Sequence, residues 1–164
     1  MTPASRSLFL RLTSLALTLT FVVSCSSARV GDGATISKIK YYNLIPQQPL
    51  NVSDPAILFE LQHHLYGAVT KAEVMNRGGH YYTIFWKAED RSQPVTVRFE
   101  YRQSSDGLVT RTKEVEIADI GRSNTTKFQV TGEEYKTLGR VTSWRITLLR
   151  GKQELVSQTS YLWN

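Results

Sequence analysis

Hydrophobic and polar side chains alternate strictly over seven residues in the middle of this chain. Odd-numbered positions from Val95 to Tyr101 hold valine, valine, phenylalanine and tyrosine, with threonine, arginine and glutamate between them. Because successive side chains of a β-strand point to opposite faces of a sheet, the pattern predicts a strand with one buried face. Turn-forming residues at 103–107 and a Val- and Thr-rich segment over 108–117 then predict the return strand of a hairpin.

Other short segments carry similar signals. The predicted strands are 80–87, 125–131, 141–149 and 154–163. The last two flank a turn and predict a second hairpin, whereas 80–87 is apolar at both parities, which predicts a strand that is central or covered on both faces. Six to eight short strands in one domain predict an all-β fold, an antiparallel β-sandwich. A small β-barrel is the alternative, because periodicity does not distinguish the two.

The segment between the predicted N-terminal region and the first clear strand has two interpretations. Hydrophobic residues at 57, 59, 61 and 65 share one parity, as in a strand. Those at 57, 58, 61 and 65 also form a helical stripe, with Ser53 or Asp54 as N-cap and Pro55 in the first turn. We expect a strand over 57–66 and a short helix over 70–77.

The first 24 residues have the composition of a secretion signal. Arg6 and Arg11 are basic, no acidic residue is present, and an uncharged stretch of 13 residues runs from Leu12 to Ser24. This stretch is shorter than the roughly 18 apolar residues of a membrane-spanning helix. Residues 1–24 are therefore predicted to be a signal peptide with a helical hydrophobic core.

The sequence Val-Val-Ser-Cys at 22–25 resembles the lipobox of bacterial lipoproteins, and Cys25 is the single cysteine of the chain. The resemblance implies cleavage before Cys25, acylation of its sulfur, and membrane lipid as a partner. The envelope is then the expected location. Ser26, in place of aspartate, implies the periplasmic face of the outer membrane in a Gram-negative host. A plain signal peptide cut near Ala28 is the alternative.

The remaining chain divides into a short linker and a domain. Residues 25–38 comprise the lipidated cysteine and a Ser- and Gly-rich segment, which predicts a flexible tether. The β-sandwich is expected over 39–164. Loss of residues 1–24 removes two arginines and no acid, so the net charge falls from +6 to +4. This mild charge gives no indication of nucleic-acid binding.

The number and spacing of the strands resemble those of immunoglobulin-like and fibronectin type III-like domains. The resemblance is architectural and implies core tryptophans on opposite sheets, for which Trp86 and Trp144 are the candidates. The paired cysteines of antibody domains are missing, because Cys25 is the only cysteine.

Catalytic and metal-binding patterns are weak in this sequence. Adjacent side chains at His63 and His64 would point to opposite faces of a strand, so they would not share one metal ion. The acidic pairs 89–90 and 133–134 are adjacent rather than opposed, and no Gly-x-Ser-x-Gly motif occurs. We therefore expect no enzyme activity, no metal and no cofactor.

Four residues of the C-terminal hairpin are the candidate partner contacts. They are two aromatic and two basic residues: Tyr161, Trp163, Arg150 and Lys152. The leading hypothesis is a membrane-anchored, non-catalytic binding or structural module with an envelope protein or glycan as partner. The alternative is a carbohydrate- or peptidoglycan-binding module that uses exposed aromatic residues. A hydrolase with an unrecognised site is the third hypothesis.

Overall fold

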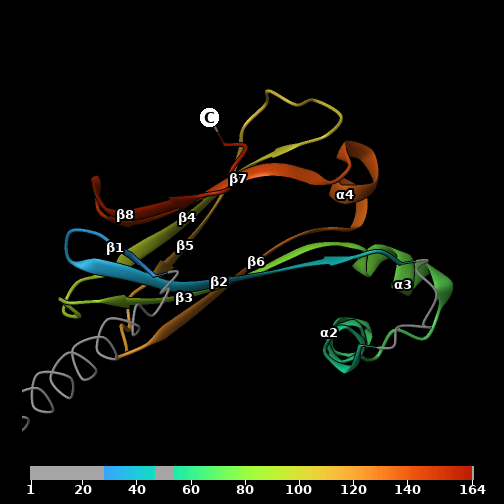
Figure 1. Cartoon of the computed structure of the whole chain (residues 1–164), viewed down its shortest axis with the longest axis horizontal. Helices are drawn as coiled ribbons and strands as arrows, with labels where there is room; N and C mark the ends of the chain where they lie inside the picture. Colours follow the sequence, from blue (N-terminus) through green and yellow to red (C-terminus); the bar gives the residue numbers. More distant parts are fainter. Residues whose placement is uncertain (1–27, 47–53, 164) are drawn as a thin grey trace, which may run out of the picture.

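The computed structural model describes residues 28–46 and 54–163 (Figure 1). The predicted signal peptide and Cys25 lie outside the described residues. The elements, in chain order, are β1 (Arg29–Val30), β2 (Ala34–Leu44), α2 (Pro55–Leu65), α3 (Lys71–Arg77), β3 (Gly79–Ala88), β4 (Val95–Gln103), β5 (Arg111–Ile117), β6 (Asn124–Thr131), α4 (Gly132–Leu138), β7 (Val141–Arg150) and β8 (Gln153–Thr159).

The described strands form two four-stranded antiparallel sheets packed as a sandwich, which confirms the predicted fold class over the barrel alternative. Sheet A has the strand order β1-β2-β3-β6, and sheet B has the order β5-β4-β7-β8. The two predicted hairpins are β4–β5 and β7–β8. Strand β3, which is apolar at both parities, is central in sheet A, as predicted. Strand β5 begins at Arg111, later than the predicted start at 108.

Aromatic residues from both sheets fill the core between the layers. Trp86 of β3 and Phe99 of β4 have no exposed surface, and Tyr82 is almost fully buried. The indole Nε1 of Trp86 donates a hydrogen bond to Thr126 Oγ1 at 3.0 Å, so the one polar atom of this ring is satisfied. Trp144 of β7 is half-buried and packs against the same core from sheet B. The predicted placement of the two tryptophans on opposite sheets is confirmed.

The prediction of a strand over 57–66 is wrong, because Pro55–Leu65 form helix α2. The Asp54 carboxylate accepts a hydrogen bond from the Ala56 N–H at 2.8 Å, and Pro55 occupies the first turn. Of the side chains that suggested a strand face, Leu61 is buried, but Phe59 is 65% exposed. The shared parity therefore did not report a buried face. The predicted helix near 70–77 is confirmed as α3. This helix begins with a capping box between Thr70 and Glu73.

The ordered domain also begins earlier than the predicted boundary at residue 39. Strand β1 begins at Arg29, and strand β2 places Ala34 and Ile36 in the core. A side chain at Gly31 would collide with the Leu155 carbonyl oxygen of β8, so only glycine fits this contact between the layers. The glycine at position 31 is thus explained by this close approach to β8.

The three described helices gather at one end of the sandwich, to the right in Figure 1. Along the chain, helices α2 and α3 come between strands β2 and β3, and α4 connects β6 of sheet A to β7 of sheet B. The Lys136 ammonium of α4 donates to the Asn76 side chain of α3 at 2.6 Å, which joins the helices of the two layers. Helix α4 was not predicted from the sequence.

Candidate functional site

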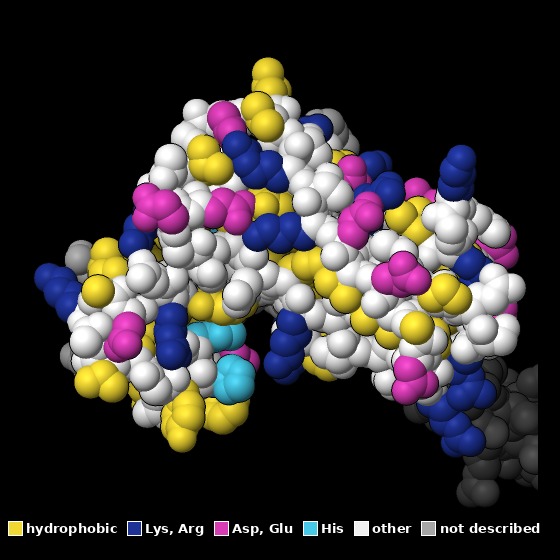
Figure 2. Space-filling model, turned by 180° about the vertical axis from the view of Figure 1, so that it is seen from behind, with side chains coloured by type: hydrophobic (Ala, Val, Ile, Leu, Met, Phe, Trp, Pro, Cys, Tyr) yellow, Lys and Arg dark blue, Asp and Glu magenta, His cyan; other side chains and the backbone are white. Residues whose placement is uncertain are grey.

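An open groove lies between helix α2 and the outer face of sheet A, with a volume of about 870 Å³. Figure 2 shows it as a hollow with histidine on one wall and a basic residue on the other. We call it the α2 groove. Its floor consists of three rows across β2, β3 and β6: Lys38–Phe85–Thr125, Lys40–Thr83–Lys127 and Tyr42–Tyr81–Gln129. Its wall carries four side chains of α2: Phe59, Glu60, His63 and His64.

A β-bulge in β2 determines which side chains face the groove. The pairing register of β2 with β3 shifts between Ile36 and Lys38, so Ser37 is an extra residue in the strand. Ile36 points into the core on one side of the bulge, and Ile39 packs against the core on the other. Without the bulge, Lys38 would share the parity of Ile36 and point inward. The bulge therefore places the two lysines of β2 on the groove floor.

Helix α2 is held over the floor by ring stacking and by one arginine. The His64 ring stacks on Tyr81 at a centroid distance of 3.9 Å and on Tyr42 at 5.2 Å. The Arg77 guanidinium at the end of α3 donates hydrogen bonds to the carbonyl oxygens of His64 (3.1 Å) and Tyr66 (2.5 Å). The Tyr81 hydroxyl in turn donates to the Arg77 carbonyl at 2.6 Å. These contacts fix the width of the groove at its closed end.

The electrostatics of the closed end favour a neutral His64. Burial against the two tyrosines, followed by the neighbouring His63 and by Lys127, lowers the pKa of His64, which the Glu60 carboxylate at 3.6 Å opposes. At neutral pH the imidazole is therefore an uncharged ring that stacks on Tyr81. Its position in the aromatic stack is structural, and its side chain also lines the groove.

Positive charge is concentrated on the open part of the floor. Lys38, Lys40 and Lys127 are exposed, and no described carboxylate lies within ion-pair distance of their ammonium groups. The Lys40 ammonium lies 5.9 Å from the centroid of the Phe85 ring. Among the described lining residues only Glu60 is acidic. The floor thus combines aromatic surface with lysines that have no acidic partner among the described residues.

This set of side chains is suited to binding. Lysine ammonium groups and aromatic rings bind anionic and planar groups, and the threonine and glutamine side chains of the floor supply hydrogen bonds. Within residues 28–46 and 54–163, no group of three or more His, Cys, Asp and Glu side chains is arranged to hold a metal ion. Sequence reasoning missed the groove, because the strand prediction for 57–66 removed the helix that forms its wall.

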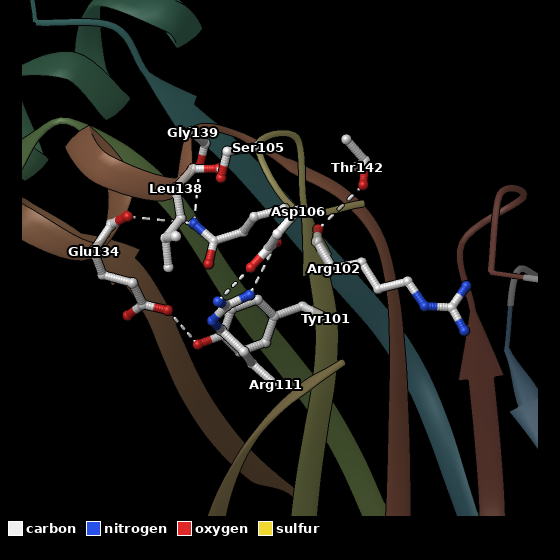
Figure 3. A network of polar contacts seen from close by, with 10 residues as sticks. Tyr101, Arg102, Ser105, Asp106, Arg111, Glu134, Leu138, Gly139 and Thr142 are labelled. Atoms are coloured by element: carbon white, nitrogen blue, oxygen red, sulfur yellow. Dashed lines mark hydrogen bonds and ion pairs between the residues drawn. The ribbon is translucent and has the colours of Figure 1, made fainter. Parts of the chain in front are cut away.

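A second polar cluster lies where α4 meets sheet B, and its contacts hold the fold together (Figure 3). The Tyr101 hydroxyl donates to the Glu134 carboxylate, which also pairs with the Lys113 ammonium at 2.9 Å. Burial, followed by this carboxylate, raises the pKa of Tyr101. The Arg111 guanidinium pairs with Asp106 at 2.5 Å, which closes the β4–β5 hairpin. Because these charges neutralise one another, the cluster offers no free charge to a ligand.

The predicted contact residues do not form one surface. Arg150 and Lys152 lie at the β7–β8 turn, whereas Tyr161 and Trp163 follow the end of β8 at Thr159, at the other end of that hairpin. The prediction that a strand extends to 163 is therefore wrong.

The four predicted contact residues differ in whether their side chains are free to contact a partner. Arg150 donates to the Asp90 carbonyl at 2.8 Å, so its guanidinium is already engaged. The Trp163 ring is half-buried and packs beneath the guanidinium groups of Arg102 and Arg145, at 4.6 and 5.5 Å. Tyr161 is 95% exposed and Lys152 is exposed. These two remain candidates for separate contacts.

Comparisons with known proteins provide no family. A scan against protein-family models found no match, and a search of curated proteins found none. A search of solved structures found a crystal structure of β-D-glucoside glucohydrolase from Trichoderma reesei, at 12% identity and a TM-score of 0.33. The match covers 77% of this chain and 18% of that enzyme. Similarity at this level supports no inference about function.

The described helices are short. None of those within residues 28–46 and 54–163 has the length and apolar character needed to cross a bilayer.

Proposed function

We propose that this protein is a lipid-anchored, non-catalytic binding module of the bacterial envelope, and that the α2 groove is its binding surface. The observation that carries the proposal is the groove itself, a hollow of about 870 Å³ with exposed aromatic and basic side chains on a rigid sheet. Binding sites are typically concave, with a few polar groups among aromatic ones. The anchor rests on the lipobox-like residues 22–25 and on the basic and hydrophobic segments that precede them.

The short connection to the anchor bears on how the domain would be presented. Four peptide units separate Cys25 from Arg29, where β1 begins, and a fully extended chain spans at most about 3.5 Å per residue. A lipidated domain would therefore lie within about 14 Å of its anchor point. Two or three acyl chains on Cys25 would hold it firmly, since each buried methylene adds about 0.8 kcal/mol. In a Gram-negative host, Ser26 favours the periplasmic face of the outer membrane.

Carbohydrate binding is the second candidate, as a more specific form of the first. The observation that favours it is the presence of aromatic rings along the groove, with Phe59 of the α2 wall 65% exposed and Phe85 on the sheet floor. Tyr161, which sequence reasoning proposed for this role, is exposed, but the Trp163 ring already packs against the guanidinium groups of two arginines. The groove is therefore a better candidate for a glycan site than the C-terminal aromatic pair.

Lipidation is tested by metabolic labelling with palmitate and by membrane fractionation of the full chain. The Cys25→Ser variant is expected to lose the label and to leave the membrane fraction, because its side chain does not form the thioether. Label retained in this variant would contradict the anchor.

The binding surface is tested separately in intact cells. A photo-crosslinking amino acid at Gln129, on the groove floor, is compared with the same residue at Glu116, which is exposed on sheet B. We expect a discrete adduct from position 129 and none from position 116. Equal labelling at both positions, or none at either, would refute the groove as the binding surface.

A further inference from the structure

The three lysines of the α2 groove lie at fixed positions on one sheet. Lys38 and Lys40 are two residues apart on β2, which separates their backbone positions by roughly 7 Å. Lys40 and Lys127 lie on either side of Thr83 in one row, roughly 10 Å apart across two strand spacings. A ligand that satisfies all three ammonium groups must carry more than one negative charge along its length.

We propose that the α2 groove binds an anionic oligosaccharide, a sugar chain with carboxylate, phosphate or sulfate substituents. This inference rests on the proposed function, because it names the ligand of the same site. The lysines have no described acidic partner, and Glu60 is the single acid among the described lining residues. Charge complementarity therefore requires an anionic occupant.

The remaining floor residues fit the uncharged parts of a sugar chain. The faces of Tyr42 and Tyr81 are used by the stacked His64, whereas Phe85 lies in the open part of the floor. This ring, with the Lys40 ammonium 5.9 Å from its centroid, offers the C–H face of a sugar an apolar surface beside a positive charge. Polar residues surround Phe85 on the same sheet face, namely Thr83 on β3 and Thr125 and Gln129 on β6. Their hydroxyl and amide groups can form hydrogen bonds with sugar hydroxyls.

Two other anionic partners fit this geometry less well. An extended acidic peptide is recognised mainly through backbone hydrogen bonds at a sheet edge. The floor instead presents its lysines, aromatic ring and polar side chains on a sheet face that runs from β2 across the central β3 to the edge strand β6. A membrane surface attracts protruding basic side chains, whereas these lysines lie on the floor of a hollow walled by α2.

Calorimetric titration of the full-length lipidated protein in detergent micelles tests the inference. The probes are hexagalacturonate, a heparin hexasaccharide, the neutral maltohexaose and a hexaglutamate peptide. We expect an anionic hexasaccharide to bind at least about tenfold more tightly than the neutral sugar and the peptide, with affinity that falls as salt rises. Failure of both anionic sugars to bind at millimolar concentration overturns the inference.

Variants identify the site of binding. The double variant Lys40→Gln and Lys127→Gln is expected to lose about tenfold in affinity, since each exposed charge pair contributes modestly. Phe85→Leu keeps apolar volume without the ring and is expected to lose about fivefold. Lys87→Gln, on the same strand but outside the groove lining, is the matched control and should change affinity less than about twofold. An equal loss in Lys87→Gln would overturn the placement of the site.

The outcomes separate this inference from the proposed function. A groove adduct at position 129 in cells, with tighter binding of maltohexaose or of hexaglutamate in the titration, would refute the anionic sugar and retain the binding module. Absence of that adduct would refute the binding surface itself.

Discussion

Acid should destabilise this domain through His80, a histidine buried between the two layers. Its side chain is 1% exposed, and its Nε2 accepts a hydrogen bond from the Val141 N–H at 3.3 Å. A proton on Nε2 would break this bond and place a charge beside the rings of Tyr41 and Tyr135. Burial, followed by the positive charge of Arg140, lowers the pKa of His80 from 6.5 to about 4.

The expected size follows from the difference in proton binding between the folded and unfolded chains. An unfolded histidine with a pKa of 6.5 takes up a proton between pH 6.5 and 4, where folded His80 does not. The stabilisation is therefore complete above pH 6.5 and is lost as the pH falls towards 4. The shift corresponds to about 3 kcal/mol in total, with a slope of about 1.2 kcal/mol per pH unit near pH 5.2.

Urea denaturation from pH 7 to pH 4 measures this effect, with His80→Gln as the comparison. Glutamine does not titrate, and its amide oxygen keeps an acceptor for the Val141 N–H. We expect the wild type to lose about 3 kcal/mol more stability than the variant over this interval. His64, whose pKa is also lowered, is present in both proteins and cancels in the difference. Parallel stability curves for the two proteins would refute the assignment to His80.

Three further substitutions test how the sandwich is held together, each by urea denaturation at pH 7. Trp86→Phe should lower the free energy of unfolding by about 2 kcal/mol, because it leaves a void and removes the hydrogen-bond donor to Thr126. A decrease below about 0.5 kcal/mol would be inconsistent with the burial of Trp86. Glu134→Gln should cost about 1 kcal/mol by removing the ion pair with Lys113, an effect that must shrink in 1 M salt if it is electrostatic. Gly79→Ala should lower the free energy of unfolding by more than about 2 kcal/mol, because φ at this position is 143° and the new methyl group would meet a carbonyl oxygen of β6. An unchanged free energy of unfolding would contradict this backbone geometry.

Strands β4 and β6 were predictable because the sequence of each alternates between buried side chains and side chains that face solvent. Strand β4 alternates from Val95 to Tyr101, and its odd positions are all buried in the structure. Strand β6 likewise buries Phe128 and Val130, the two residues that the alternation places inward. In such strands one face touches the opposite sheet and the other meets solvent, so periodicity and tertiary structure agree.

For helix α2, at the end of the sandwich, capping residues were a better predictor than hydrophobic periodicity. Helix α2 has only Leu61 buried, and residues of both its exposed and its packed faces are hydrophobic, so the pattern did not define a face. Its local signals, Asp54 as N-cap and Pro55 in the first turn, were the better evidence. Capping residues act on the adjacent backbone, whereas parity is informative only where one side of an element is buried.

The groove depends on relations between segments that no single segment encodes. Its floor requires the bulge at Ser37, which is visible only in the pairing of β2 with β3. Its wall requires His64 to stack on Tyr81, from elements separated by α3. The sequence did contain one indication, since 80–87 is apolar at both parities and predicted a strand covered on both faces. The outer face of β3 is covered by α2 at Tyr81 and open at Phe85, and this partial cover leaves an aromatic surface beside lysines that have no described acidic partner. This partial cover is a relation between α2 and β3, so neither segment alone could have predicted the groove.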